Sequence, residues 1–369
     1  MDFGGINPVI LIASLMVSSV PILLAALGEA VVERSGVLNL GVEGLMIIGA
    51  IGGFIVAVKT GNPFLGFLGG AVAGAALAMI FAALTLVFQA NQVATGLALT
   101  LFGLGVASLA GQDYVGINPP PTAKLPFGPL AQIPVLGPIL FNHDWVVYFS
   151  IAMTAGLWWI LRSTRLGLII RAVGESHDAA HALGYKVNRI RLACIAFGGA
   201  MAGMGGAYIS LVRVPQWTDG ITAGAGWIAL AIVVFASWKP WRVLVGAWLF
   251  GGITALQLNI QVAGGLPIGI LDLIVILSVL ALLLQAAALF LLRQPARPAT
   301  SALVTVGIMV TISAICHIFG ISRIGISVEY LSMAPYLITI LVLVIMSSGG
   351  ARAALGAPAA LGQNFHASR

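Results

Sequence analysis

Long apolar segments separated by short polar connections dominate the chain. A helix needs roughly 20 apolar residues to cross the hydrocarbon core of a bilayer. The pattern predicts an all-α, polytopic transmembrane helical bundle of about 11 spans. The seventh segment is short, and either re-enters the membrane or continues past Lys239-Pro240, where proline kinks or stops a helix. The segments lie near 8–28, 40–58, 63–88, 92–110, 145–161, 192–212, 226–238, 242–260, 268–292, 300–320 and 331–347.

Composition agrees with this pattern. The chain has 369 residues, of which 60% are hydrophobic and 8% are charged, against roughly 25% charged in soluble domains. So few charges cannot cover a water-compatible surface, so lipid is the expected solvent. No basic residue precedes the first apolar segment, whereas a cleaved signal peptide begins with a positive region. We therefore expect an uncleaved first span.

The basic residues predict an orientation. The longest polar connections are 111–144 and 162–191, and the second carries six Lys or Arg. Basic loops face the cytoplasm, so alternation places the N-terminus outside and the C-terminus in the cytoplasm. Of 17 Lys and Arg, thirteen then fall inside, and four fall outside, namely Lys59, Lys124, Arg213 and Arg323. The same asymmetry explains the net charge of +6, so we expect no nucleic-acid partner.

Ionisable groups at membrane depth are costly and therefore candidate functional residues. Glu29, Glu33, Asn39 and Glu43 lie close together in the early part of the chain. They predict either a polar lining of a substrate path or a buried polar latch between helices. The latch is favoured for Glu29 and Glu33, and both interpretations stay open for Glu43. Asn39 and Glu43 are four residues apart and would share one face of a helix.

A second polar group begins at Gln89. Asn91, Gln92 and Thr95 offer amide and hydroxyl groups at the start of a span. Neutral groups of this kind suit an uncharged polar solute, such as a sugar or nucleoside, although a capped helix start would explain Asn91 alone. Trp227 is either an interfacial anchor or a surface for stacking a ligand.

The remaining candidates point away from metal and enzyme chemistry. His177 and His181 are four apart beside Glu175 and Asp178, but no third ligand is evident, so we expect no metal and a solvated helix face. Two cysteines lie in apolar runs without metal-ligand partners. The sequence contains no phosphate loop, no HExxH and no nucleophile elbow. We expect a chain that is not an enzyme and binds neither ATP nor another cofactor itself.

Several motifs resemble one family. ERSGVLNLGVEGLMIIGA (33–50) and RAVGESHDAAHALGYKVNRIR (171–191) are similar to motifs of permease subunits from bacterial ABC importers of nucleosides and simple sugars. That group also includes ribose and branched-chain amino acid permeases. NQVATGLAL, GAGWIALA, YLSMAPYLITILVL and the tail APAALGQNF are supporting matches. The resemblance covers 1–264 and resumes near 326.

The resemblance implies partners and a mechanism. It implies two ABC ATPase subunits that bind ATP, a second permease in a hetero- or homodimer, and an extracytoplasmic solute-binding protein. ATP hydrolysis on the partner would move this chain through a coupling loop, and solute would pass between two permease chains. The implied coupling-loop residues are Arg171, Glu175, His177, Ala179, Ala180 and Gly184.

The sequence also departs from the family pattern. His177 replaces a usual proline, Ala225 replaces a frequent arginine, and 265–325 has no counterpart. The expected parts are a permease core (1–264) with a cytoplasmic coupling loop (162–191), an inserted transmembrane hairpin (265–325), a last span (326–347) and a flexible cytoplasmic tail (348–369). Asp272 is the one costly residue of the hairpin. The rival class is an ion-coupled secondary transporter, which requires carboxylates deep in the spans.

Overall fold

The computed structural model describes residues 8–125, 127–262, 333 and 356–365. The chain divides into two compact units. The larger unit combines 8–255 with 335–369, and it contains every site considered below. The smaller unit combines 1–7 with 256–334 and lies almost entirely outside the described residues.

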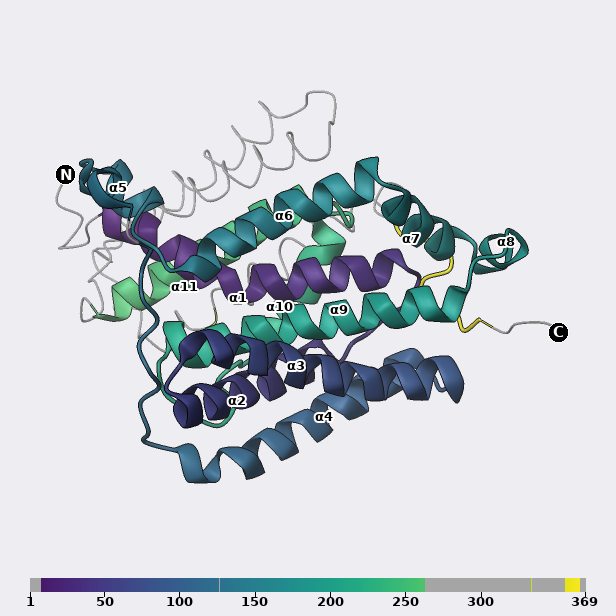
Figure 1. The fold of residues 1–369 in the computed structure, drawn as a ribbon, viewed down its shortest axis with the longest axis horizontal. Helices are drawn as coiled ribbons and strands as arrows, with labels where there is room; N and C mark the ends of the chain where they lie inside the picture. The colour runs from purple at the N-terminus through teal and green to yellow at the C-terminus, as the bar shows by residue number, and fades with distance from the viewer. Residues whose placement is uncertain (1–7, 126, 263–332, 334–355, 366–369) are drawn as a thin grey trace, which may run out of the picture. The chain divides into compact units, whose positions relative to one another are not determined.

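The described part is all-helical, without strands (Figure 1). Seven helices are long and apolar enough to cross a membrane, and α10 is a shorter apolar helix. The first eight expected segments are therefore confirmed as helices, while 268–292, 300–320 and 331–347 lie outside the described residues. The long elements are α1 (Pro8–Arg34), α2 (Val42–Thr60), α3 (Pro63–Ala82) with its π-helical extension Ala83–Val87, α4 (Gln92–Gly111), α6 (Trp145–Ser163), α9 (Val187–Tyr208) with its extension Ile209–Arg213, α10 (Ala225–Phe235) and α11 (Pro240–Val262).

Shorter elements connect these helices. Two 3-10 turns (Gln112–Tyr114 and Gly128–Gln132) and α5 (Leu136–Leu140) lie between α4 and α6. Between α6 and α9, α7 (Arg165–Glu175) and α8 (His177–Ala182) form most of the basic 162–191 segment. Side chains cap several helix starts: Asn62 accepts from Phe64 N at 2.9 Å, and Asp144 accepts from Val146 N at 2.9 Å.

Glycines let α2, α3 and α9 approach closely. A Cβ built on Gly49 would lie 2.2 Å from Gly203 Cα, and one built on Gly74 would lie 2.3 Å from Gly199 O. No larger residue fits such a contact without moving a backbone. The glycine-rich stretches 69–74 and 198–203 therefore serve close helix packing, which is how helices associate in lipid.

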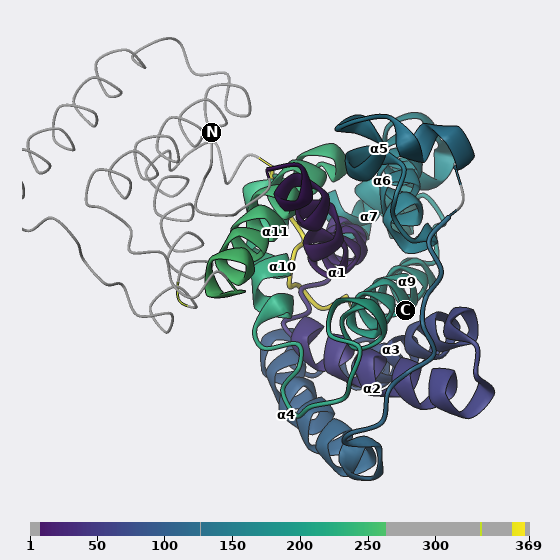
Figure 2. The same ribbon diagram turned by 90° about the vertical axis from the view of Figure 1, so that its left-hand side faces the viewer.

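The long helices alternate in direction. Along α1 and α9, Gly28 meets Gly198 and Pro21 meets Gly205, so this pair is antiparallel. One end of the unit, here the α8 end, holds the end of α1, the start of α9 and the turn between α3 and α4; α5 and the start of α6 lie at the opposite end (Figures 1 and 2). Among the described basic residues, Lys59, Lys124 and Arg213 lie at the opposite end, while the orientation of the bundle in the membrane stays a prediction.

Neither α2 nor α10 spans the full length of the unit. The connection 35–41 folds back along α1, so that Asn39 N lies 3.3 Å from Glu29 Oε1. At the start of α10, a Cβ built on Gly226 would lie 2.5 Å from Glu43 N, so the N-termini of α2 and α10 meet inside the unit. Trp217 pairs with Val115, just after the end of α4. From there the chain runs through irregular residues and then α10 to Trp238, which lies beside Glu33. Helix α10 ends at Phe235, so the continuation past Lys239-Pro240 is wrong.

Candidate functional site

The N-termini of α2 and α10 meet on one carboxylate. Glu43, 5% exposed in the first turn of α2, accepts from Thr222 Oγ1 at 2.5 Å, Gly224 N at 3.2 Å and Gly226 N at 2.8 Å. Backbone N–H groups at a helix start are unpaired within the helix, and the positive end of the helix dipole favours an anion. Glu43 supplies that anion to both helices. We call this arrangement the Glu43 junction.

The neighbouring polar residues also hold the bundle together. Glu29 accepts from Asn39 N, and Glu33 accepts from Trp238 Nε1. Asn39 Oδ1 accepts from Gly41 N at 2.8 Å. The structure corrects the placement of Asn39: it lies in the 35–41 connection, not on one helical face with Glu43, because α2 begins only at Val42. These contacts are those of a latch, and in them the side chains of Asn39 and Glu43 bond to protein groups.

The second polar group divides between two places. Asn91 caps α4 by accepting from Ala94 N at 3.0 Å, as the capped-start alternative expects. Asn91 and Thr95 also line an open groove along α4. Gln92 is 3% exposed and points elsewhere: its Oε1 accepts from Leu38 N at 2.8 Å, and its Nε2 donates to Asn364 Oδ1 at 3.1 Å. The other groove residues are Leu84, Ala90, Ala94, Ala98, Leu99 and Phe102.

Trp227 is not brought to this groove. It lies on α10, 41% exposed, and it is absent from the groove lining. Of the six candidate path residues, the structure brings together Asn91 and Thr95 alone. Whether Trp227 anchors the helix or stacks a ligand stays a prediction.

The candidate coupling residues lie along α7, α8 and the turn that follows. Ser176 begins α8 by accepting from Ala179 N at 3.2 Å, so the helix starts without the usual proline. Glu175 and Ala179 are exposed, whereas Ala180 is buried. Gly184 ends the turn at a φ of +89°, which favours glycine. Arg171 is half-buried, and its Nε donates to Gly167 O at 3.3 Å.

His177 corrects the expectation of a solvated helix face. It is 9% exposed, and its ring centroid lies 5.4 Å from that of Phe365. Phe365 also packs on His181 and forms a small hydrophobic cluster with Val173, Ala180 and Val187. Burial, together with the Arg191 charge, lowers the pKa of His177, and Asp178 opposes this shift. The underside of α8 is thus a small core.

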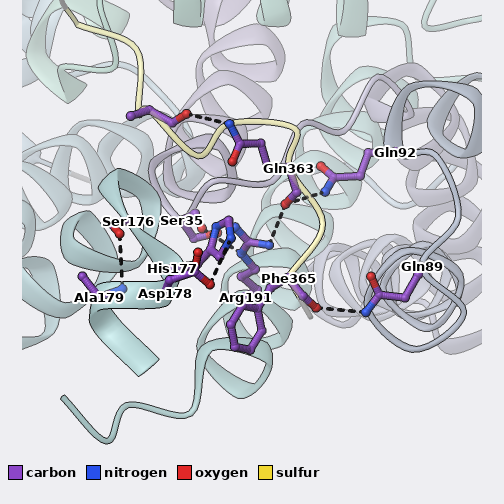
Figure 3. A network of polar contacts seen from close by, with 11 residues as sticks. Ser35, Gln89, Gln92, Ser176, His177, Asp178, Ala179, Arg191, Gln363 and Phe365 are labelled. Carbon is purple, nitrogen blue, oxygen red and sulfur yellow. Dashed lines mark hydrogen bonds and ion pairs between the residues drawn. The ribbon is translucent and has the colours of Figure 1, made fainter. Parts of the chain in front are cut away.

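The tail forms part of this region. A flexible segment was expected over 348–369, but 356–365 packs onto the α8 end, because its backbone and side chains find partners there (Figure 3). Arg191, fully buried, donates to Ser35 O at 3.2 Å and to Gln363 O at 2.9 Å. Sequence reasoning missed Arg191, Asn364 and Phe365. The motif APAALGQNF marked the tail, but no pattern indicated which residues it contacts.

Among the described residues, no group of three or more His, Cys, Asp or Glu side chains could hold a metal ion. His177 Nε2 lies 3.6 Å from Asp178 Oδ1, and both His177 and His181 face Phe365. The two histidines therefore pack on Phe365.

Seven long apolar helices, packed through glycines and carrying polar groups that bond to one another, define a multi-pass membrane protein. The comparisons agree. The chain belongs to the family of permease components of branched-chain amino acid transport systems, whose model matches residues 11–284. Permease components are the non-catalytic subunits of ABC transporters, and the ATPase is a separate chain.

Three relatives are similar over most of their length. The putative glucose ABC transporter permease protein TsgC13 of Haloferax volcanii is 43% identical over 244 residues, covering 65% of this chain and 74% of the relative. The guanosine ABC transporter permease protein NupQ of Bacillus subtilis is 35% identical over 273 residues, covering 70% and 84%. The nucleoside ABC transporter permease protein NupC of Lactococcus lactis is 32% identical over 271 residues, covering 70% and 84%. No solved structure matches the chain significantly.

Proposed function

We propose that this chain forms the translocation path of an ATP-driven importer for a small uncharged polar solute, with a nucleoside as first choice and a simple sugar as the alternative. The observation that carries the proposal is the family match over 11–284. Riboflavin and branched-chain amino acids remain further alternatives.

The groove on α4 supports the solute class. Its polar residues, Asn91 and Thr95, are uncharged, and apolar side chains surround them. The carboxylates of Glu29, Glu33 and Glu43 all accept hydrogen bonds from the protein. A sugar or nucleoside presents hydroxyls and an apolar ring face, which suit such a lining. The relatives' names include both guanosine and glucose transport.

The exposed face of α8 supports the coupling role. Glu175, Asp178 and Ala179 face outward, and Leu183 is 76% exposed in the turn that follows. We propose that this face contacts the ABC ATPase, and that Arg171, His177, Ala180 and Gly184 support it.

The remaining assignments follow from these two. The α8 end faces the cytoplasm of the inner membrane, and the opposite end faces the solute-binding protein. A second permease chain completes the path, and ATP binds only to the partner. For 265–325, which lies outside the described residues and which the family match enters as far as residue 284, we keep the proposal of an added hairpin outside the path, followed by a last span over 326–347.

The buried carboxylates argue against an ion-coupled secondary transporter. Such a protein needs a carboxylate that gains and loses a proton or ion. Glu43 instead bonds to three fixed donors. Asp272, the other deep carboxylate, lies outside the described residues.

Uptake by the reconstituted complex tests the proposal. The chain is placed in liposomes with its ATPase, second permease and binding protein, and uptake of labelled guanosine and glucose is measured. We expect uptake that requires ATP and persists when the ion gradient is collapsed. Uptake driven by an ion gradient without the ATPase would refute it.

Two substitutions address the coupling face. Glu175→Arg reverses an exposed charge, and Gly184→Trp places a bulky residue at a φ of +89°. Both should abolish uptake while the chain stays inserted in the membrane. Full uptake in both variants would refute the assignment of this face.

A further inference from the structure

Residues 356–365, here the C-terminal strap, cross the α8 end of the larger unit. At one point the strap supports α8 from beneath. Phe365 is 6% exposed, and its ring centroid lies 5.4 Å from that of His177 and 5.2 Å from that of His181. Together with Val173, Ala180 and Val187 it forms a cluster separate from the main core. Phe365 is therefore a large part of what holds α8 in place.

The same strap reaches the start of α4. Gln89 Nε2 donates to Phe365 O at 2.9 Å, and Asn364 Nδ2 donates to Gln89 O at 2.7 Å. Asn364 Oδ1 accepts from Gln92 Nε2 at 3.1 Å. Gln89 stands at a φ of +59°, which a non-glycine residue rarely adopts, so the turn between α3 and α4 is held in an unusual conformation at this contact. Asn364 and Phe365 are adjacent in the chain: the Asn364 side chain binds the start of α4, and the Phe365 side chain packs on α8.

The middle of the strap is fixed to the bundle. Ala360 N donates to Gly174 O at 2.9 Å, and Gly362 N donates to Gly36 O at 3.1 Å. The guanidinium of Arg191 joins Gln363 O to Ser35 O. The ends of α7 and α1 and the start of α9 are thus tied to the strap. Figure 3 shows Arg191 and Gln92 meeting at Gln363, and Gln89 meeting Phe365.

Helix α8 packs chiefly on α7 and α9 among the helices. The strap gives α8 a direct link to the start of α4, beside the longer route through α9, α3 and α2. Because Asn91 and Thr95 of α4 line the groove, a displacement of α8 reaches the candidate path through Phe365 and Asn364.

We propose that the C-terminal strap is the element that transmits motion between α8 and the start of α4, with Phe365 and Asn364 as its positioning residues. This inference rests on the proposed function, because it requires that an ATPase moves α8. Neither residue is proposed to touch solute or ATP.

The test compares uptake with ATP hydrolysis in the reconstituted complex. Phe365→Ala removes the contact to α8, and Asn364→Ala removes the side-chain bonds to Gln89 and Gln92. Each should lower the amount of guanosine or glucose taken up per ATP hydrolysed by about fivefold or more, which corresponds to about 1 kcal/mol of lost coupling between α8 and α4. Gln363→Ala is the matched control, since Arg191 bonds to its backbone oxygen, and it should keep the ratio.

The double variant separates transmission from stability. If both residues belong to one link, the double variant should lower uptake per ATP no further than either single variant does. Independent losses of stability would instead add. The ratio is measured per assembled complex, so a lower yield does not affect it. An unchanged ratio in both single variants, or additive losses in the double variant, would overturn the inference. Failure of the proposed function would instead appear as absent ATP-driven uptake by the wild-type complex.

Discussion

The Glu43 junction and the C-terminal strap join parts of the same unit in opposite ways. At the junction, one buried carboxylate takes three hydrogen bonds at the meeting point of two helix starts. At the strap, many weaker contacts made by neutral amides, one arginine and one phenyl ring are spread over five helices, namely α1, α4, α7, α8 and α9. The junction lies within the main packing of the bundle, and the strap lies beside a small separate cluster.

This difference in chemistry predicts a difference in mobility. Opening the junction leaves a carboxylate and backbone amides without partners, which costs several kcal/mol. Neutral hydrogen bonds contribute only about 1 kcal/mol each, so the strap can exchange contacts one at a time. The junction is the rigid point, and the α8 end is the part that moves.

The largest effect is expected at Glu43. Glu43→Ala leaves Thr222 and the amides of Gly224 and Gly226 without their acceptor, and should lower the free energy of unfolding by about 3 kcal/mol. Unfolding in mixed detergent, followed by circular dichroism, measures this. Glu43→Gln keeps one acceptor oxygen and should lose less. Equal stability of Glu43→Ala and wild type would refute the junction.

A smaller loss is expected at Trp238. Trp238→Phe removes the indole N–H that donates to the buried Glu33 carboxylate, and should cost about 2 kcal/mol. The same unfolding assay measures it. Trp159→Phe, on α6 and 59% exposed, is the matched control. A loss no greater than that of the control would show that the Glu33 contact contributes nothing.

Thr95 should affect transport and leave stability unchanged. Thr95→Val preserves shape but removes the hydroxyl that lines the groove on α4. We expect the KM for guanosine or glucose to rise about fivefold, the equivalent of one hydrogen bond of about 1 kcal/mol, while the unfolding curve stays in place. Thr60→Val, at the end of α2, is the control. An unchanged KM would remove Thr95 from the path.

The smallest effect is expected at His177. Its pKa is lowered, so the buried imidazole is neutral at pH 7. The packing of α8 is then fully present above the ordinary value of 6.5 and weakens as the pH falls through the lowered pKa. The protection factors of the α8 amides, which are corrected for the intrinsic pH dependence of hydrogen exchange, should fall on acidification below pH 6.5, and should fall less in His177→Phe. The same pH response in the wild type and in His177→Phe would contradict this role of His177.

The sequence predicted the helices well and the contacts poorly. Long apolar segments have one stable solution in lipid, which is why eight segments match. The direction of the Asn39, Glu43 and Gln92 side chains depends on hydrogen-bond partners that can be far away in the sequence. Thr222, which donates to Glu43, lies 179 residues from it. Hydrophobic periodicity does not encode such pairs.

The tail shows the same limit. Its small residues suggested a flexible segment, yet Ala360 is buried and Gly362 N bonds to Gly36 O. Small residues suit close backbone contacts as well as flexible chains. Only Phe365, a large apolar residue near the end, signals a docked segment. Composition alone does not separate these cases.

Spin labels on α8 and α4 test the central claim, that the strap makes these helices move together. The labels are placed at Ala182→Cys and Val93→Cys, both exposed, in a background carrying Cys194→Ala and Cys316→Ala. Pulsed electron–electron resonance measures their separation in the complex without nucleotide and trapped with ATP and vanadate. The account predicts one narrow distance distribution in both states and a broad one in Asn364→Ala. A wild-type distribution that is as broad as that of Asn364→Ala would contradict it.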